Sequence, residues 1–372
     1  MYQNPFSELI TPAAETDPIQ NQDLIRALLG EETAEEFAGL VSDQPKTMRQ
    51  PRPNLKALAD AALGAQPDLI ASASEKRAEQ FLRDELKIKF QQQAESLTAM
   101  RFLKVNQNGE LGNFDNSLGF YPLPTPEQVV AHFTAPEKIE FYKRKVEQGF
   151  TRVLITPFAT PLESFVGQTA RLIKRQKAAG MLRAQDGTRL ELYESKPVWV
   201  WVKLQNGDHS EELVYNVTEF DWEHHEGKTK SQLLADSTQP FPGFHIQLLQ
   251  EDLTVPREGS GTTIKDRQVI ESGKTAETYF DILQNNRIYF GEHGLTPEDW
   301  LTLFATTLHE TGIAIDDCAD GINSATYLTG CYLPASRTVP IAYWSRRDGN
   351  ANLNVSGSVQ LGSNNGLRTA VS

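Results

Sequence analysis

The histidines are the first residues to examine for chemistry, because histidine serves both as a metal ligand and as a general base. His309-Glu310 begins like the helix of a zinc protease, but Ile313 stands where the second histidine belongs. His224 and His225 are neighbours, and neighbouring side chains on a strand point to opposite sides of a sheet. We therefore predict a helix-end histidine and a solvated loop at these two places, with no metal site.

An aspartate-rich stretch at 316–320 superficially resembles a calcium loop. Starting at Asp316, that pattern requires an oxygen ligand where Cys318 stands and a glutamate where Tyr327 stands, so we interpret the stretch as a turn after a helix. Cys318 and Cys331 match no C-x-x-C motif, and neither has a basic neighbour that would favour a thiolate. The sequence therefore predicts two buried thiols and no catalytic residue, metal site or cofactor.

Composition argues against several classes of protein. The 372 residues carry 36 Lys and Arg against 49 Asp and Glu, a formal charge of −13 that disfavours binding to a nucleic-acid backbone. No apolar run approaches the roughly 20 residues of a membrane-spanning helix. Two cysteines cannot build a disulfide framework. No secretory signal is evident at the N-terminus, so we expect a cytoplasmic protein.

Helix and strand signals divide the chain near residue 110. Residues 1–110 are predicted to be a flexible acidic region with a short helix near 23–29 and a longer one near 74–99, whose apolar residues recur at helical spacing. After residue 110, hydroxyl and proline residues mark helix starts at Thr125, Thr160 and Thr296. Short apolar strands are predicted at 152–155 and at 198–202.

The last 52 residues differ from the rest, because they contain one acid, Asp348, and no lysine. From residue 350 to residue 361 polar and apolar residues alternate strictly, which predicts a strand with one packed face and one wet face. The wet face is predicted to carry Asn350, Asn352, Asn354, Ser356, Ser358 and Gln360, and the packed face Ala351, Leu353, Val355, Gly357, Val359 and Leu361. Asparagine is a poor strand former, so this pattern favours a recognition surface of small neutral hydrogen-bonding groups. A solubilising outer face or a low-complexity tail is the alternative.

The residues on either side of this alternation resemble a known family. Tyr343-Trp344-Ser345-Arg346-Arg347-Asp348 precedes it, and Gly366-Leu367-Arg368-Thr369-Ala370-Val371 follows near the end of the chain. This arrangement resembles the variable region of diversity-generating retroelement variable proteins, which have a C-type lectin-like fold related to that of formylglycine-generating enzymes. The resemblance is clearest over residues 296–372, weaker over 150–180, and absent before about residue 110.

The resemblance implies an α+β protein with a C-type lectin-like domain at 111–372. That domain would hold a long insertion at about 185–290 and a variable region at about 343–372, and a partly disordered, partly helical N-terminal region would precede it. The fold brings its ends together, so the strand at 152–155 should lie near a terminal strand at 367–371. Helices at 161–179 and 297–311 should pack on the sheet.

The resemblance also implies a binding surface. In this family template adenines are mutated during copying, so asparagine codons become diversified positions on the exposed side of a rigid scaffold. Carried over by position, the ligand-binding residues are Tyr343, Arg346, Arg347, Asp348, Asn350, Asn352, Asn354, Ser356, Ser358, Gln360, Ser363 and Asn364. Trp344 is either part of this surface or part of the core. Gly366 is expected to form a turn, and Arg368 to anchor the last strand.

The departures from related families narrow the function. Residues 296–372 contain no Glu-Pro-Asn, Gln-Pro-Asp or Trp-Asn-Asp motif of calcium-dependent sugar-binding lectins, and the catalytic cysteine pair of formylglycine-generating enzymes has no convincing counterpart. We therefore expect a non-enzymatic protein that binds an unidentified protein or other macromolecule. A formylglycine-generating-type modifying enzyme using Cys318 and Cys331, and a structural assembly protein that oligomerises through residues 74–99, are the alternatives. The oligomeric state stays open.

Overall fold

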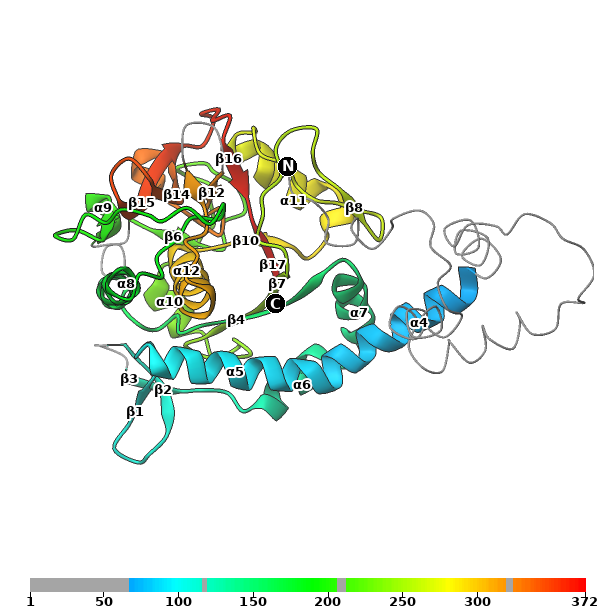
Figure 1. The fold of residues 1–372 in the computed structure, drawn as a ribbon. Coiled ribbons are helices and arrows are strands. Elements are labelled where there is room, and N and C mark those ends of the chain that lie inside the picture. The colour runs from blue at the N-terminus through cyan, green and yellow to red at the C-terminus, as the bar shows by residue number, and fades with distance from the viewer. Residues whose placement is uncertain (1–66, 116–118, 206–211, 319–323) are drawn as a thin grey trace, which may run out of the picture. The chain divides into compact units, whose positions relative to one another are not determined.

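The computed structural model describes residues 67–115, 119–205, 212–318 and 324–372, with side chains from residue 74 onward. These residues form one compact unit that begins at Pro67. Its helices and sheets confirm the predicted α+β class (Figure 1). The short helix predicted near 23–29 lies outside the described residues. In the described part, no helix combines the length and the apolar character needed to cross a membrane.

A long helical segment opens the described chain. It consists of α4 (Pro67–Gln80), the π-helical turn η1 (Phe81–Glu85) and α5 (Leu86–Ala99), which follow one another without a break. The apolar residues predicted to share one face are at most 3% exposed, namely Phe81, Leu82, Leu86 and Phe90. Leu86 and Phe90 belong to α5, which packs along β4 (Phe150–Thr156) of the main sheet, and the turn η1 with Phe81 and Leu82 packs against α6 (Pro126–Phe133) and α7 (Ile139–Glu147). The boundary predicted near residue 110 is therefore wrong, and the compact unit begins at residue 67.

The first of two main sheets contains both strands that the sequence predicted to be close. Its order is β10 (His293–Gly294), β17 (Thr369–Val371), β7 (His245–Gln250) and β4, all antiparallel. β4 and β17 therefore share a sheet, but β7 lies between them. β7 comes from the segment at 185–290, so that segment is no simple insertion: its apolar run pairs inside the sheet.

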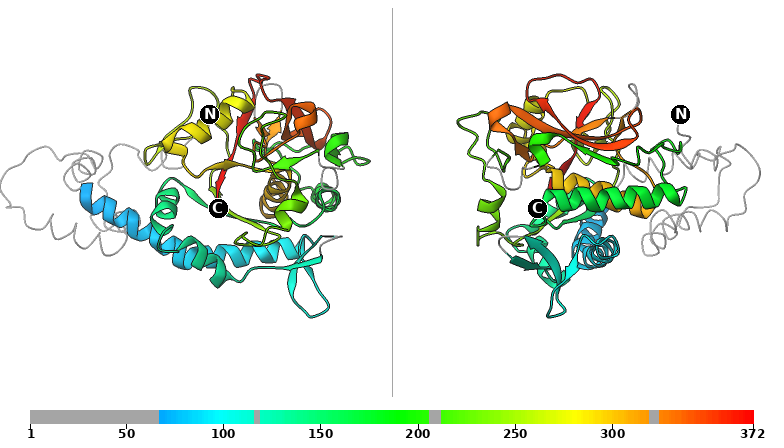
Figure 2. Two further views of the ribbon diagram at one scale, coloured as in Figure 1. Left: turned by 180° about the vertical axis from the view of Figure 1, so that it is seen from behind. Right: turned by 90° about the vertical axis from the view of Figure 1, so that its left-hand side faces the viewer.

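The second main sheet contains the C-terminal residues. Its order is β16 (Asn365–Leu367), β12 (Ala325–Tyr327), β14 (Thr338–Ser345), β15 (Asn350–Gly357) and β5 (Val198–Val200), and β11 (Asp317–Cys318) also pairs with β14. β14 and β15 form an antiparallel hairpin, and β5 lies parallel to β15. Figures 1 and 2 show this hairpin on the side of the unit opposite α5.

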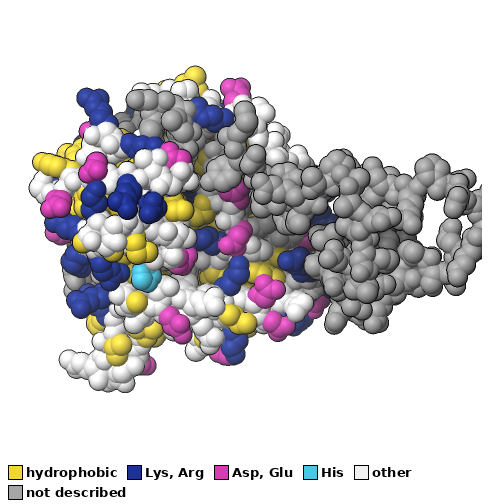
Figure 3. Space-filling view, in the orientation of Figure 1, with side chains coloured by type: hydrophobic (Ala, Val, Ile, Leu, Met, Phe, Trp, Pro, Cys, Tyr) yellow, Lys and Arg dark blue, Asp and Glu magenta, His cyan; other side chains and the backbone are white. Residues whose placement is uncertain are grey.

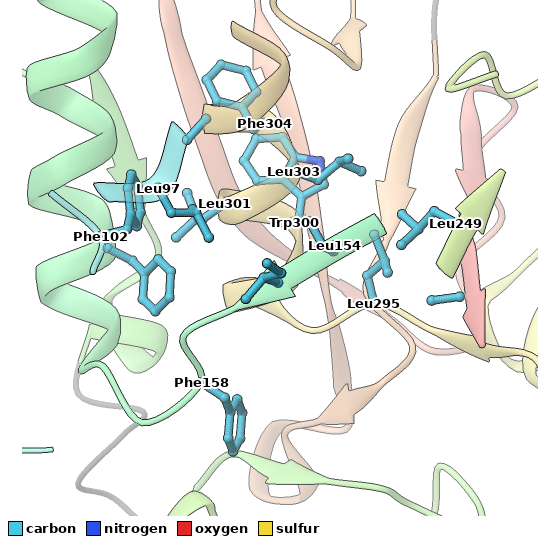
Figure 4. Packing of buried hydrophobic residues seen from close by; sticks show 14 of the residues in the cluster. Leu97, Phe102, Leu154, Phe158, Leu249, Leu295, Trp300, Leu301, Leu303 and Phe304 are labelled. Atoms are coloured by element: carbon cyan, nitrogen blue, oxygen red, sulfur yellow. The ribbon is translucent and has the colours of Figure 1, made fainter. Parts of the chain in front are cut away.

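α12 (Pro297–Thr311) lies between the two sheets and packs on β4, β14 and α8 (Leu162–Ala178). It begins at Thr296, as the sequence predicts, with a capping box between Thr296 and Asp299, and it ends at Gly312 with a φ of +74°. Figure 4 shows its residues Trp300, Leu301, Leu303 and Phe304 among side chains from other elements, including Leu154 of β4. α8 begins after Pro161 without a side-chain cap, so the hydroxyl cap predicted at Thr160 is wrong.

The remaining elements are shorter and complete the unit. They are β1 (Lys104–Val105), β2 (Leu111–Asp115), β3 (Gly119–Pro122), α6 (Pro126–Phe133), α7 (Ile139–Glu147), α9 (Val202–Gln205), β6 (Val214–Tyr215), α10 (Lys230–Leu234), β8 (Thr263–Ile264), β9 (Arg267–Gln268), α11 (Ala276–Asn285), η2 (Arg287–Tyr289), β13 (Cys331–Tyr332) and η3 (Pro334–Ser336). Among them, α6 begins with the predicted capping box between Thr125 and Gln128.

Candidate functional site

The inward face of the β14–β15 hairpin is part of the main hydrophobic core. Trp344, Ala351 and Leu353 are 0% exposed. The Trp344 ring lies parallel to the ring of Phe304 on α12, with centroids 6.3 Å apart and an interplanar angle of 4°. Trp344 is therefore a core residue, and the packed face begins as the alternation predicts.

The other face of the hairpin, called outward here, carries the polar residues of β15 beside Tyr343 and beside Val339 and Ile341, which are buried in a second hydrophobic cluster. The register places Tyr343 of β14 opposite Asn352 of β15, and Asn352 opposite Trp199 of β5. Directly opposite residues share one face of a sheet, so two aromatic side chains flank this amide. Tyr343 and Trp199 are half-buried. Trp201 continues the edge, because its backbone N–H donates to the Leu353 carbonyl at 2.9 Å.

The first two asparagines of β15 are buried, which corrects the prediction that they lie on a wet face. Asn350 is 4% exposed and Asn352 is 6% exposed. The Asn352 Nδ2 donates to the carbonyl and the side-chain oxygen of Asn350, at 3.1 and 2.8 Å. The Asn350 Nδ2 donates to the Lys196 carbonyl at 3.3 Å. These amides are covered because β5 and the residues before it lie along this half of β15.

The alternation reverses where β15 ends at Gly357. Ser358 is buried at 9% exposure, whereas Val359 and Leu361 are 71% and 67% exposed. Both the wet-face prediction for Ser358 and the packed-face prediction for Val359 and Leu361 are therefore wrong. The chain turns there, since the Gln360 N–H donates to the Gly357 carbonyl at 3.0 Å, and side-chain alternation requires a continuing strand.

The loop after the turn lies at the rim of the outward face. Gln360 and Ser363 are exposed, and Asn364 is half-buried. The loop is docked through its backbone: the Gln360 carbonyl accepts from the Tyr327 hydroxyl at 2.9 Å, and the Ser358 carbonyl accepts from the Glu277 N–H at 3.1 Å. Asn354 and Ser356, in the second half of β15, are also half-buried. Side chains at these positions are therefore accessible on a fixed backbone.

The turn between β14 and β15 is held by one of its two arginines. Arg346 bonds to the Asp317 carboxylate, and its Nη2 lies 3.0 Å from Asp186 Oδ2. Hydrogen bonds from Thr188 lower the pKa of Asp186 to about 2, and the charge of Arg346 adds to this effect. Arg347 and Asp348 are exposed, although Asp348 accepts from the Ser345 hydroxyl at 2.7 Å. Arg346 is therefore an anchor, and Arg347 is accessible to a ligand.

Figure 3 shows that Lys and Arg side chains gather on the side of the unit that carries α8 and α9. On α8 the exposed cations are Arg171, Lys174 and Arg175. The Arg346 ion pair with Asp186 links the hairpin turn to the chain that follows this helix. The overall charge of −13 therefore conceals a local basic surface.

Asp316, in the aspartate-rich stretch after α12, is a structural anchor. Asp316 is 1% exposed and accepts from Trp300 Nε1 at 2.8 Å and from Arg368 Nη2 at 2.7 Å. Arg368 therefore anchors the end of the chain as predicted. Within the described ranges, no three His, Cys, Asp or Glu residues are arranged to hold a metal ion.

Gly366 does not form the turn that the sequence predicted, and glycine is needed there for a different reason. It lies in β16 and not in a turn, and a Cβ at this position would come 2.4 Å from Val255 Cγ1. Such a distance is too short for two carbon atoms, so the close approach of two chain segments favours glycine. The expectation that Gly366 has a structural role holds, but through packing.

The structure also places the two cysteines and His224, which the sequence raised as candidates for chemistry. Cys331 is buried, and its burial together with nearby Glu298 and Asp299 raises the pKa of its thiol well above the ordinary value. Cys318 is half-buried, so the prediction of two buried thiols is confirmed for Cys331 alone. His224 is exposed, and its Nδ1 lies 3.0 Å from Asp221 Oδ1.

Trp199 and Trp201 are the residues of this surface that the sequence did not assign to it. The alternating run of valine and tryptophan at 198–202 predicts a strand, and β5 confirms it at 198–200. The run carries no signal that its partner is β15, about 150 residues further along the chain.

Comparison of the chain with protein-family models, with curated proteins and with solved structures found no match.

Proposed function

We propose that this chain is a non-enzymatic binding protein that presents exchangeable side chains on the outward face of the β14–β15 hairpin. One observation carries the proposal: polar residues at the end of β15 and in the loop after it are accessible on a fixed backbone, although the buried Val339 and Ile341 lie on the same face of the hairpin. Trp344 and Leu353 face the core with 0% exposure, while Asn354 and Ser356 point outward and are half-buried. Replacing an outward residue leaves the core contacts intact, and such surface changes usually alter stability by within about ±0.5 kcal/mol.

The scaffold we propose is the C-type lectin-like fold of diversity-generating retroelement variable proteins. The support is the resemblance of residues 343–371. A second support is that β4 and β17 belong to one sheet, because that fold brings the ends of its domain together. The buried ion pair between Arg368 and Asp316 would keep such a terminal segment rigid.

Burial divides the predicted ligand-binding residues into two groups. We assign ligand contact to the accessible positions, which are Tyr343, Arg347, Asp348, Asn354, Ser356, Gln360, Ser363 and Asn364. Asn350, Asn352 and Ser358 are buried, and Arg346 is held by two carboxylates, so these four would support the surface from beneath. Trp199 adds half-buried aromatic area, which commonly supplies much of the energy of protein recognition, and the half-buried Trp201 beside it also packs against the main core.

The ligand class we propose is a protein or another macromolecule. The contact residues follow one face of a sheet and its rim, and they line neither the recess near residues 249–256 nor the one near residues 227–236. Small molecules usually bind in concave pockets that enclose most of their surface. A broad surface with aromatic anchors and adaptable amides and hydroxyls is better suited to a large partner.

Two libraries of the full chain, displayed on yeast, would test this function. One library randomises positions 347, 354, 356, 360, 363 and 364, and the matched library randomises the inward positions 342, 344, 351 and 353. We expect most members of the first library to resist protease as the parent does, and members selected on immobilised lysozyme to bind it. Members of the second library should lose protease resistance. Equal losses in the two libraries would contradict the proposal.

The neighbouring DNA supplies an independent test of the retroelement. We expect a near-copy of the 3′ end of the gene that differs mainly at adenines, beside a gene for a reverse transcriptase. Independent isolates should then differ chiefly at the accessible positions and conserve the codons of Trp344 and Leu353. Variation spread evenly along the gene would contradict diversification by a retroelement. The two libraries would still test whether the surface tolerates exchange of its side chains.

A further inference from the structure

Arg267, at the start of β9, has one hydrogen-bond donor without an acceptor. The residue is 1% exposed. Its Nε and Nη2 each donate to one oxygen of Glu292 at 2.7 Å, and Nη2 also lies 3.2 Å from Thr369 Oγ1. Its Nη1 is buried and has no partner among the described residues. Buried donors in native proteins are nearly always satisfied, so this atom indicates a missing acceptor.

The guanidinium of Arg267 is held in one orientation. Its Cζ lies 5.0 Å from the centroid of the Phe150 ring and 5.2 Å from that of the Tyr289 ring. The Tyr289 hydroxyl is itself tied to the Gln268 carbonyl at 3.0 Å. The two rings and the bidentate ion pair with Glu292 restrict rotation of the guanidinium group, so Nη1 cannot reach another acceptor.

A small recess adjoins this donor. Its volume is about 20 Å³, and its wall includes Arg267, Arg368 and Thr369 together with apolar side chains such as Leu249 and Leu367. A recess of this size holds a single water molecule or an ion of similar radius. Arg267 lines the recess, and Nη1 is the nitrogen of its guanidinium that has no acceptor among the described residues.

The buried charges around the recess leave a surplus of one positive charge. Arg267 and Lys145 share the carboxylate of Glu292, and the Lys145 Nζ lies 2.8 Å from Glu292 Oε1. Arg368 and Asp316 balance each other, with Nη2 and Oδ1 2.7 Å apart. Burial, as the largest effect, lowers the pKa of Lys145. A counter-ion would reduce the free-energy cost of burying this surplus charge.

Two other carboxylates, those of Asp252 and Glu147, do not bond to Arg267 Nη1. Asp252, on its wall, is exposed to solvent and accepts from the Thr254 N–H at 2.8 Å. Glu147, the last residue of α7, lies 3.9 Å from the Lys265 Nζ, and its Oε1 is buried without a hydrogen-bond partner. Neither bonds to Arg267 Nη1, which has no partner.

We propose that the recess binds one small monovalent anion, such as chloride, which accepts a hydrogen bond from Arg267 Nη1. The unsatisfied donor, the size of the recess and the surplus charge all favour the same occupant. A water molecule would satisfy the donor but leave the charge uncompensated, and a sulfate ion is too large for the space. The anion would stabilise the contact between β9 and β17, and so fix the end of the chain independently of any ligand on the hairpin.

Thermal unfolding of the full chain tests the site. Samples in sodium chloride, sodium bromide and sodium gluconate at one ionic strength separate specific binding from screening. We expect Tm to rise by about 2 °C in chloride or bromide at ten times the dissociation constant, and not in gluconate. Arg267→Lys, which removes Nη1, should abolish the difference between the salts. The matched variant Arg171→Lys, on the exposed face of α8, should retain it.

Crystals of the unaltered protein grown in bromide make the test independent of how well a variant folds. We expect an anomalous bromide peak beside Arg267 Nη1, within hydrogen-bonding reach. A water molecule there without anomalous signal, together with equal Tm values in chloride and gluconate, would overturn the proposal. An anomalous peak at this position without any effect on Tm would also overturn the stabilising role.

Discussion

The two halves of β15 have the same alternating sequence and different surroundings. In the first half, Asn350 and Asn352 are buried and bonded to one another and to the Lys196 carbonyl. In the second half, Asn354 and Ser356 are half-buried. The register explains the difference, because β5 pairs with residues 351–353 and ends there. A residue type repeated along one strand therefore has two roles, support and display, and the neighbouring strand decides which.

The comparison makes predictions of graded size, and the largest concerns the inward face that both halves share. Leu353→Asn keeps the approximate volume but places an unpartnered amide in the core next to Ala342. We expect the free energy of unfolding to fall by about 4 kcal/mol, combining lost apolar burial with the cost of the amide. Urea denaturation measures this change. A loss below that caused by changes at Asn352 would contradict the division into faces.

The second prediction separates the two halves directly. Asn352→Ala removes the amide that donates twice to Asn350 and leaves the Asn350 oxygen without a buried partner. We expect a loss of about 1–2 kcal/mol in the free energy of unfolding. The control Asn354→Ala, two residues along on the same face, should change it by within about 0.5 kcal/mol. If urea denaturation gave the same value for both, the two halves of β15 would be equivalent and the assignment of roles would fail.

The third prediction asks whether β5 causes the difference. Trp199 lies opposite Asn352, so Trp199→Ala should open this amide to water. Once it is wet, Asn352→Ala should cost less, and a double-mutant cycle should show a coupling of about 0.5–1.5 kcal/mol. The matched cycle of Trp199 with Ser356, which lies beyond the end of β5, should show no coupling. Additive effects in the first cycle would mean that Trp199 does not cover the amide.

The local elements could be predicted from the sequence because their signals are short-ranged. Thr296 and Asp299 form a capping box three residues apart. The apolar residues of 74–99 share one face of a helix whichever element packs against it. The orientation of Leu353 toward the core also follows from alternation alone, whereas the sequence left Trp344 open between surface and core. Each of these features is decided within a few residues of chain, so tertiary structure had little to add.

What could not be predicted depends on pairing between distant segments. Alternation tells which way Asn352 points but not that Trp199 will stand beside it. It also fails at Val359, because nothing in the pattern marks the end of β15 at Gly357. The boundary near residue 110 was wrong for a related reason: the apolar face of the helix at 74–99 is covered by β4, α6 and α7, which belong to a later part of the chain.

The smallest predicted effect is a pH response confined to the hairpin turn. Asp186 contacts Arg346, and its pKa in the folded protein is lowered from 3.8 to about 2, chiefly by hydrogen bonds from Thr188. A lowered folded pKa means that the contribution of this carboxylate to stability is complete above its ordinary pKa and is lost as pH falls toward 2. Because Asp186 is exposed, the loss should loosen the turn and leave global unfolding almost unchanged.

Amide NMR of the hairpin between pH 5 and 2 measures this response. The signals of Gly349 and Arg347 should titrate with a midpoint near the lowered pKa of about 2, whereas that of Asn352, in the supported half of β15, should stay constant. Asp186→Asn should remove the titration at the turn, since the amide keeps a similar shape but carries no charge for Arg346. A midpoint near 3.8, or an equal response at Asn352, would show that the turn and the supported half of β15 are not anchored separately.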